Sequence, residues 1–245
     1  MNLTDMTTAE IVITVLQWGI PLILAITLHE AGHAYAAKKL GDPTADREGR
    51  VSLNPVKHID PIGTILIPAL LFIMKAPFLF GYAKPVPVSY NRLNTLPRDI
   101  ALVAFAGPLA NGILIVLSAL AFNLVPVIPD AAQEPFAKML AISIGVNTVL
   151  GCFNLIPLPP LDGSKILMVI APKPIGKFIY ELERYGMFLI IGILLLMPYI
   201  SQVLGYNPLA VFFASAIDNV LHIVEPLMKL HCISIRSEAC GNLLQ

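Results

Sequence analysis

Long apolar runs separated by short polar stretches dominate the chain. Five of these runs predict helices, and each is close to the roughly 20 residues that an α-helix needs to cross the hydrocarbon core of a membrane. They cover residues 11–37, 99–125, 137–157, 186–204 and 208–228. A sixth run, 61–80, is interrupted by three prolines, a glycine and a lysine. The pattern predicts an all-α polytopic membrane protein with five transmembrane helices and one broken segment.

The composition agrees with this class. Hydrophobic residues make up 56% of the chain and charged residues only 13%, with a mean hydropathy of +0.76, whereas soluble domains carry roughly a quarter charged residues. The net charge is zero and no basic stripe occurs, so no nucleic acid partner is expected. The longest hydrophilic stretch, 38–60, is too short for a soluble domain. We therefore expect a single membrane-embedded domain over 1–245.

Lysine and arginine residues gather in four segments, which predicts the orientation of the chain. Residues 38–60, 81–98, 163–185 and the tail from 229 hold 14 of the 16 basic residues. Basic loops stay in the cytoplasm, so we expect the N-terminus outside and the C-terminus cytoplasmic. This holds only if 61–80 enters and leaves on the cytoplasmic side as a re-entrant segment shielded by protein. A full sixth crossing is the alternative.

The first apolar run contains the sequence His-Glu-Ala-Gly-His at 29–33. Histidines four residues apart lie one turn from each other on one face of a helix, so His29 and His33 could bind one metal ion. Glu30 is placed to move the protons of a metal-bound water. Ionisable side chains inside a membrane are costly to bury and are usually functional. His33 is about 8 Å of helix from Lys38, which puts the motif nearer the cytoplasmic face.

A catalytic zinc ion usually takes three protein ligands and leaves one position for water. The best candidate for the third ligand is Asp162, in the segment Asn-Leu-Ile-Pro-Leu-Pro-Pro-Leu-Asp-Gly at 154–163. The prolines end a helix that runs towards the cytoplasmic side, which brings this carboxylate to the same side as the histidines. The local sequence supports an alternative equally well, in which Asp162 caps a helix that begins at Ser164.

Several blocks of sequence between residue 24 and about 170 resemble the site-2 protease family of intramembrane zinc metalloproteases, in matching order and spacing. The motif at 29–33 resembles the family's zinc-binding helix, 154–163 its N-x-x-P-x-P-x-x-D-G segment, and 107–111 its G-P-x-x-N helix start. Residues 54–63 and 81–88 resemble segments of compact bacterial and archaeal members, which lack an added PDZ or CBS domain.

The resemblance implies a role for each matching residue. His29, His33 and Asp162 would bind one Zn²⁺ per chain, and Glu30 would be the general base that activates zinc-bound water. The catalytic core would occupy about 11–170, and 171–245 would add two membrane helices and a short tail.

Four further residues are candidates for substrate binding. Asn111 and Asn154 would line the site and bind the substrate backbone or stabilise the oxyanion. For each, the alternative is a hydrogen bond between membrane helices. Alternating prolines exclude a central strand at 81–88. A small membrane-associated hairpin there could still present Lys84 and Val86 as an edge to which an extended substrate adds. A plain cytoplasmic loop is the alternative.

These expectations describe an intramembrane protease that cleaves within or next to transmembrane segments of membrane-protein substrates. Its setting would be the lipid bilayer of a bacterial or archaeal cell membrane, with an unidentified adaptor or a homo-oligomer as candidate partners. One alternative is a metal transporter, which predicts coordinating residues staggered through the membrane. Another is a catalytically silent chaperone that binds membrane segments.

Overall fold

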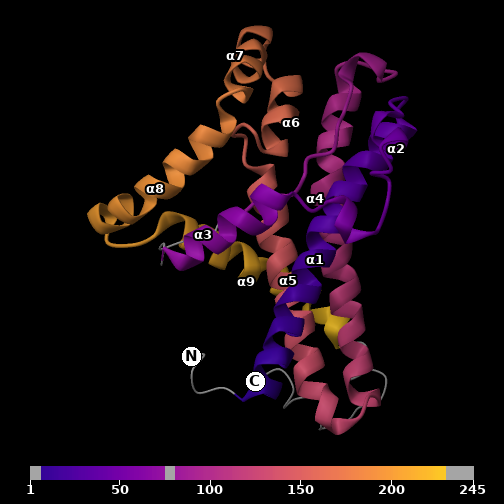
Figure 1. Ribbon diagram of the computed structural model, residues 1–245, viewed down its shortest axis with the longest axis vertical. Coiled ribbons are helices and arrows are strands. Elements are labelled where there is room, and N and C mark those ends of the chain that lie inside the picture. The colour runs from indigo at the N-terminus through magenta and orange to yellow at the C-terminus, as the bar shows by residue number, and fades with distance from the viewer. Residues whose placement is uncertain (1–6, 75–80, 230–245) are drawn as a thin grey trace.

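The computed structural model of the protein describes residues 7–74 and 81–229. Its helices are shown in Figure 1. In chain order they are α1 (Thr8–Lys39), α2 (Thr44–Arg47), η2 (Pro55–Lys57), η3 (Pro61–Leu66), α3 (Ile67–Ile73), η4 (Tyr90–Arg92), α4 (Arg98–Ala121), η5 (Phe122–Val127), α5 (Asp130–Leu155), α6 (Asp162–Ile170), α7 (Lys173–Glu183), α8 (Gly186–Leu204) and α9 (Pro208–Met228). Within the described residues, five helical segments are long and apolar enough to cross a membrane: α1, α4 with η5, α5, α8 and α9. The predicted all-α polytopic class is confirmed.

Polar residues extend two of these helices beyond the apolar runs. α1 begins at Thr8 because Thr7 and Glu10 form a capping box. The backbone N–H of Glu10 donates to the Thr7 hydroxyl (3.3 Å), and the backbone N–H of Thr7 donates to the Glu10 carboxylate (2.8 Å). α5 begins at Asp130, seven residues before the apolar run that starts at 137. The apolar run therefore marks the membrane-spanning part of a helix and not its ends.

α1, α4 and α5 pack side by side as an upright bundle (Figure 1). Small residues let α1 and α4 approach closely, since a Cβ atom on Gly32 would lie 2.7 Å from the backbone oxygen of Ala106. Ala25 and Ala34 are fully buried on α1. The backbone of α4 therefore lies directly against the middle of α1.

The connection from α5 to α6 places the start of α6 beside the bundle. α5 ends at Leu155, a proline-rich stretch follows, and α6 begins at Asp162. A Cβ atom on Gly163 would lie 2.2 Å from the carbonyl oxygen of Leu155, so only glycine permits this close return. Because α6 also contacts α4, its first residue faces the bundle.

α8 leaves the bundle obliquely (Figure 1). It begins in close contact with the proline-rich stretch, since a Cβ atom on Gly186 would lie 2.6 Å from the backbone nitrogen of Pro160. Gly186 and Ile190, both in its first turns, are its buried residues. Little of the helix beyond these turns is therefore packed against the rest of the protein.

The course of α9 differs from the topology that the charge count predicts. Near its start, the ring of Phe213 lies 6.3 Å from the ring of Phe153 at the end of α5. At its end, the side chain of Asn123, just after α4, donates to the carbonyl oxygen of Leu227 (2.7 Å). α9 thus ends at the same end of the bundle at which α1 begins (Figure 1). Opposite sides were predicted for the two termini. Residues 1–6 and the tail after 229 lie outside the described residues, so the sides of the membrane on which the two termini lie stay a prediction.

The broken apolar run forms a short helical segment, η3 followed by α3. Together these 13 residues span about 20 Å at most, less than the roughly 30 Å of a bilayer core. Residues 75–80 lie outside the described residues, so the choice between a re-entrant segment and a sixth crossing stays a prediction.

The predicted membrane-associated hairpin is not found among the described residues. Residues 81–89 form no strand. The backbone N–H of Tyr82 donates to the carbonyl of Gly63 (3.1 Å), and that of Lys84 to the carbonyl of His58 (2.9 Å). The alternating prolines that follow carry no N–H, so a regular ladder cannot continue.

Single cysteines introduced into a cysteine-free variant will test this topology. We expect cysteines at Asn94 and Asp130 to react with a membrane-impermeant maleimide from opposite sides, because α4 lies between them. A cysteine at Lys229 is expected to react from the same side as that at Asp130. Labelling after detergent solubilisation is the control for reactivity. Reaction of the Lys229 cysteine from the Asn94 side would contradict the observed course of α9 and support the charge-based topology.

Candidate metal centre

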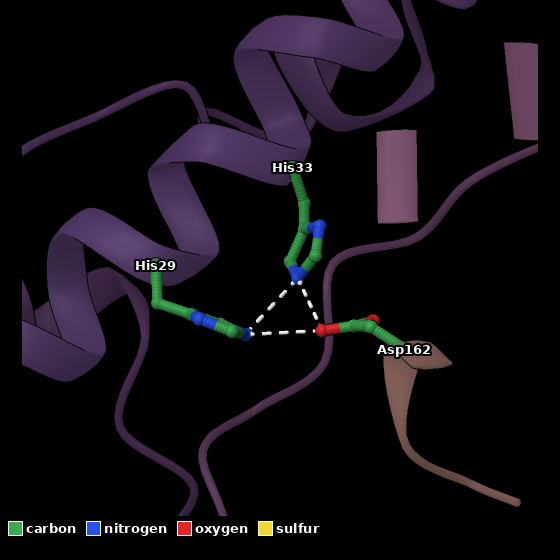
Figure 2. Close-up of side chains that lie close together, drawn as sticks. All are labelled: His29, His33 and Asp162. Atoms are coloured by element: carbon green, nitrogen blue, oxygen red, sulfur yellow. Dashed lines mark hydrogen bonds and ion pairs between the residues drawn. The ribbon is translucent and has the colours of Figure 1, made fainter. Parts of the chain in front are cut away.

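Two helices bring together three side chains that are far apart in the sequence (Figure 2). His29 and His33 come from consecutive turns of α1, and Asp162 is the first residue of α6. The Nε2 atoms of the two histidines are 3.1 Å apart. The Oδ2 atom of Asp162 lies 3.3 Å from Nε2 of His29 and 3.1 Å from Nε2 of His33. All three residues are buried, with exposed fractions of 5%, 8% and 6%. The residues predicted as ligands converge on one point.

The second ring nitrogen of each histidine faces a hydrogen-bond acceptor on α4. Nδ1 of His29 lies 2.7 Å from Oδ1 of Asn111, and Nδ1 of His33 lies 2.7 Å from the carbonyl oxygen of Val103. Both Nδ1 atoms must therefore carry the proton, and in a neutral imidazole the Nε2 atom is then a bare lone pair. The two Nε2 atoms point towards each other and towards Asp162 (Figure 2).

This arrangement fits a metal ion. Two lone pairs and a carboxylate oxygen at 3.1–3.3 Å repel one another unless a cation lies among them. A proton could form a hydrogen bond between only two of the three atoms, whereas a metal ion can be bound by all three. Two imidazole nitrogens and one carboxylate oxygen match a donor set of catalytic zinc, which keeps a fourth position for water or substrate. The chemistry of the donor set therefore agrees with zinc.

The Asp162 carboxylate contacts the two histidines and does not cap a helix. Burial alone would raise the pKa of this carboxyl, whereas the neighbouring Lys165 ammonium lowers it. Nζ of Lys165 lies 3.6 Å from Oδ1, and it is Oδ2 that approaches the histidines. The capping alternative is wrong, because α6 begins at Asp162 itself, with Leu161 as its N-cap and no side-chain cap bond.

Gly107 of α4 makes room for the two imidazole rings. A Cβ atom there would lie 2.4 Å from Nε2 of His33 and 2.7 Å from Cε1 of His29. Carbon and nitrogen atoms that are not bonded do not approach this closely. The glycine of the Gly-Pro-Leu-Ala-Asn block at 107–111 therefore lets the backbone of α4 lie against the two imidazole rings.

Glu30 follows His29 on α1, at the edge of the face that carries the histidines. The residue is half-buried, and among the described residues no hydrogen bond or ion pair engages its carboxylate. Such a carboxylate is free to exchange a proton with a molecule that enters the site.

Asn111 lies behind His29, where its side chain makes hydrogen bonds between helices. Its side chain is fully buried. Its Oδ1 accepts from His29, while its Nδ2 donates to the carbonyl of Ala25 (3.3 Å) and to Oδ1 of Asn147 (2.9 Å). Both amide hydrogens are therefore in use. The alternative interpretation, a hydrogen bond between membrane helices, describes Asn111, and the bond has the added effect of fixing the proton on His29.

The contacts made by Val103 and Asn147 were not predicted from the sequence. The Val103 carbonyl is a backbone group, for which the sequence carries no signal. Asn147 did carry one, because it lies on an apolar helix two turns before Asn154, and a buried amide in a membrane helix needs a partner.

The other substrate-binding candidates make no described hydrogen bond with the three ligands. Asn154 donates through Nδ2 to a carbonyl one turn earlier on α5 (2.9 Å), and its Oδ1 has no partner among the described residues. The backbone of Lys84 is engaged inside the chain, since its N–H donates to His58 (2.9 Å) and its carbonyl accepts from Arg50. The N–H and carbonyl of Val86 have no partner in the described part of the chain. Of the two strand candidates, Val86 is thus the one whose main-chain groups have no partner among the described residues.

Comparison with known proteins gives consistent matches. The family model described as peptidase family M50 matches residues 125–198. The Bacillus subtilis protein named "Putative zinc metalloprotease YwhC" is 39% identical over 193 residues, which cover 76% of this chain and 82% of that protein. "Putative zinc metalloprotease Rip2" of Mycolicibacterium smegmatis is 28% identical over 181 residues, covering 74% of this chain and 66% of that protein. "Zinc metalloprotease MJ0392" of Methanocaldococcus jannaschii is 26% identical over 166 residues, covering 65% and 36%. No solved structure matches the chain.

Proposed function

Since this chain belongs to the M50 peptidases, the site-2 protease family of zinc metalloproteases, we propose that it cleaves peptide bonds within or next to the transmembrane segments of membrane proteins. Family membership and the five membrane-length helices make it an integral membrane zinc metalloprotease. One observation carries the finer proposal: His29 and His33 are buried within a membrane-spanning helix. A bond cut beside them must be presented inside the membrane or at its edge.

His29, His33 and Asp162 are the residues that would hold one Zn²⁺ per chain. The proposal is supported by their three converging atoms and by the acceptors that keep both Nε2 lone pairs free of protons. When bound, zinc polarises a substrate carbonyl and lowers the pKa of water towards neutrality. The proton transfers fall to the chain itself.

Glu30 would be the residue that moves the protons. It would accept one proton from the attacking water and deliver one to the nitrogen of the leaving amine. Its place beside the histidines on α1 and its unengaged carboxylate support this role.

A substrate helix must be unwound before it can be cut, because its carbonyls are shielded by their own hydrogen bonds. An extended substrate could pair with the free N–H and carbonyl of Val86, as peptides do at sheet edges. The unpartnered Oδ1 of Asn154 could accept a hydrogen bond from a substrate amide. Residues that break helices should therefore favour cleavage when they lie near the bond that is cut.

The site would open towards the cytoplasm. His33 is one and a half turns, or about 8 Å, from Lys38 on α1, and basic residues mark the cytoplasmic side of membrane proteins. We propose that the protein resides in the cell membrane of a bacterium or archaeon, the source of the relatives above. A membrane-protein substrate and the bilayer are its expected partners, with an adaptor or a second copy as further candidates and no nucleic acid.

The two alternatives have less support. A metal transporter needs ligands at several depths, whereas in the described part of the chain the detected group of three is His29, His33 and Asp162. A catalytically silent chaperone has no use for a free carboxylate beside these ligands, and Glu30 offers one.

Removal of the metal is expected to abolish cleavage reversibly. The purified protein in lipid nanodiscs would be incubated with single-span model substrates that carry a helix-breaking residue near their cytoplasmic end. Dialysis against 1,10-phenanthroline should remove one zinc per chain, measured by mass spectrometry, and should stop the appearance of fragments. Zn²⁺ should restore both, and Mg²⁺ should restore neither, because two imidazoles favour zinc. Cleavage at an unchanged rate by zinc-free protein would refute the proposal.

A further inference from the structure

A chain of hydrogen bonds runs from His29 through the interface between α4 and α5. His29 Nδ1 meets Asn111 Oδ1 (2.7 Å), and Asn111 Nδ2 donates to Asn147 Oδ1 (2.9 Å). Asn147 Nδ2 then donates to the backbone carbonyl of Ser143 (2.8 Å), and the Ser143 hydroxyl pairs with that of Ser118 (2.8 Å). Both asparagines have an exposed fraction of 0%. The two side-chain amides therefore have no access to water and depend on protein partners.

Backbone carbonyls fix the direction of this chain. A carbonyl oxygen can only accept, so the Ser143 carbonyl requires the NH₂ group of Asn147 and leaves the Asn147 oxygen facing Asn111. The Ala25 carbonyl and that Asn147 oxygen together require both hydrogens of the Asn111 NH₂ group. The Asn111 oxygen must then face His29. The Ser143 carbonyl thus sets the orientation of Asn147, and Asn147 together with the Ala25 carbonyl sets that of Asn111.

The opposite orientation of Asn111 would be harmful to a metal site. Its NH₂ group would face Nδ1 of His29, which would favour the tautomer with the proton on Nε2. That proton would lie among His29, His33 and Asp162, where the three ligand atoms converge. A metal ion would then have to displace it before binding.

We propose that Asn147 is a positioning residue of the metal centre, which acts through Asn111 to keep Nε2 of His29 free for zinc. This inference rests on the proposed function for the identity of the metal and extends the site by one residue on α5. Groups that orient metal ligands from behind typically change metal affinity 10- to 100-fold when they are removed.

The chain offers a matched control in the next residue. Thr148 is also buried, with an exposed fraction of 2%, and its hydroxyl donates to the Ile144 carbonyl one turn earlier (2.8 Å). It makes no described contact with Asn111. Thr148→Val therefore removes a buried hydrogen bond from the same helix without disturbing the chain to His29.

The test measures zinc affinity without substrate, by competition with a chromophoric chelator on purified, folded protein. Asn147→Leu is expected to raise the Kd for zinc by about 10- to 100-fold, and Thr148→Val by less than about twofold. In an Asn111→Ala background, Asn147→Leu should add less than about twofold, because its effect passes through Asn111. If the leucine variant does not fold, Asn147→Ala replaces it, with the unfolding midpoint of each variant recorded.

An unchanged zinc Kd in the Asn147 variant would overturn the inference, and so would a full additional effect in the Asn111→Ala background. Both outcomes are independent of catalysis. If the wild-type protein bound zinc but cut no membrane substrate, the proposed function would fail while a raised Kd in the Asn147 variant would still support this role. The two failures can therefore be told apart.

Discussion

Replacement of Glu30 by glutamine is expected to stop cleavage while zinc remains bound. The two side chains have nearly the same shape, but an amide cannot accept the proton of the attacking water. General acid–base groups typically contribute 10²- to 10⁴-fold, so we expect the rate to fall by about 10³-fold. Glu30 is not one of the three converging residues, so zinc content should stay at that of the wild type. Fragment formation from a single-span substrate and metal content by mass spectrometry are the two measurements.

Glu48→Gln is the matched control, because Glu48 lies exposed just after α2 and far in sequence from the ligands. It removes the same charge and should leave the rate unchanged. Cleavage by the Glu30 variant at the normal rate would show that another group moves the proton. Loss of zinc from it would show instead that the glutamate helps to hold the metal.

Gly107→Ala is expected to empty the metal site. The added methyl carbon would lie 2.4 Å from Nε2 of His33, the nitrogen proposed to bind zinc. The ring cannot move without losing the hydrogen bond from its Nδ1 to the Val103 carbonyl. Overpacking of this kind costs about 1–3 kcal/mol. We expect the Kd for zinc to rise by about 100-fold, as it does when ligand-orienting groups are lost, with activity lost in parallel.

Gly112→Ala on the same helix is the control, because a Cβ atom there would meet nothing within 4 Å. Alanine is also a better helix former than glycine, so neither substitution should weaken the helix itself. Normal zinc affinity in the Gly107 variant would mean that the imidazoles have room to rearrange, and that the contact with α4 does not set the site.

Much of the fold was predictable because each membrane span corresponds to a long apolar run in the sequence. An apolar run of about 20 residues has few other uses, so all five long helices could be found. Their ends could not, since the capping box of Thr7 and Glu10 uses polar side chains outside the run. The course of α9 was also missed. Charged residues indicate only the side of the membrane on which a loop lies. They do not predict a contact between two helices such as that of Asn123 with Leu227.

The metal-binding group was predictable for a different reason. Helical spacing alone relates His29 to His33, and the proline-rich stretch brings Asp162 to the same side. Asn111 was identified as a site residue, but its contact with His29 could not be predicted, because the sequence does not say which group a buried amide faces. Asn147 was not predicted either, because its contact is with the side chain of Asn111.

The division of the ligands between α1 and α6 has a consequence for synthesis of the protein. His33 precedes Asp162 by 129 residues. At translation speeds of about 5–20 residues per second, the ribosome needs about 6 to 26 seconds to pass from one to the other. During that interval the nascent chain carries two imidazoles without their carboxylate. With the proposed ligand set, the enzyme would therefore enter the membrane inactive, and its proteolytic chemistry would begin only after three long helices have been inserted and the start of α6 has docked.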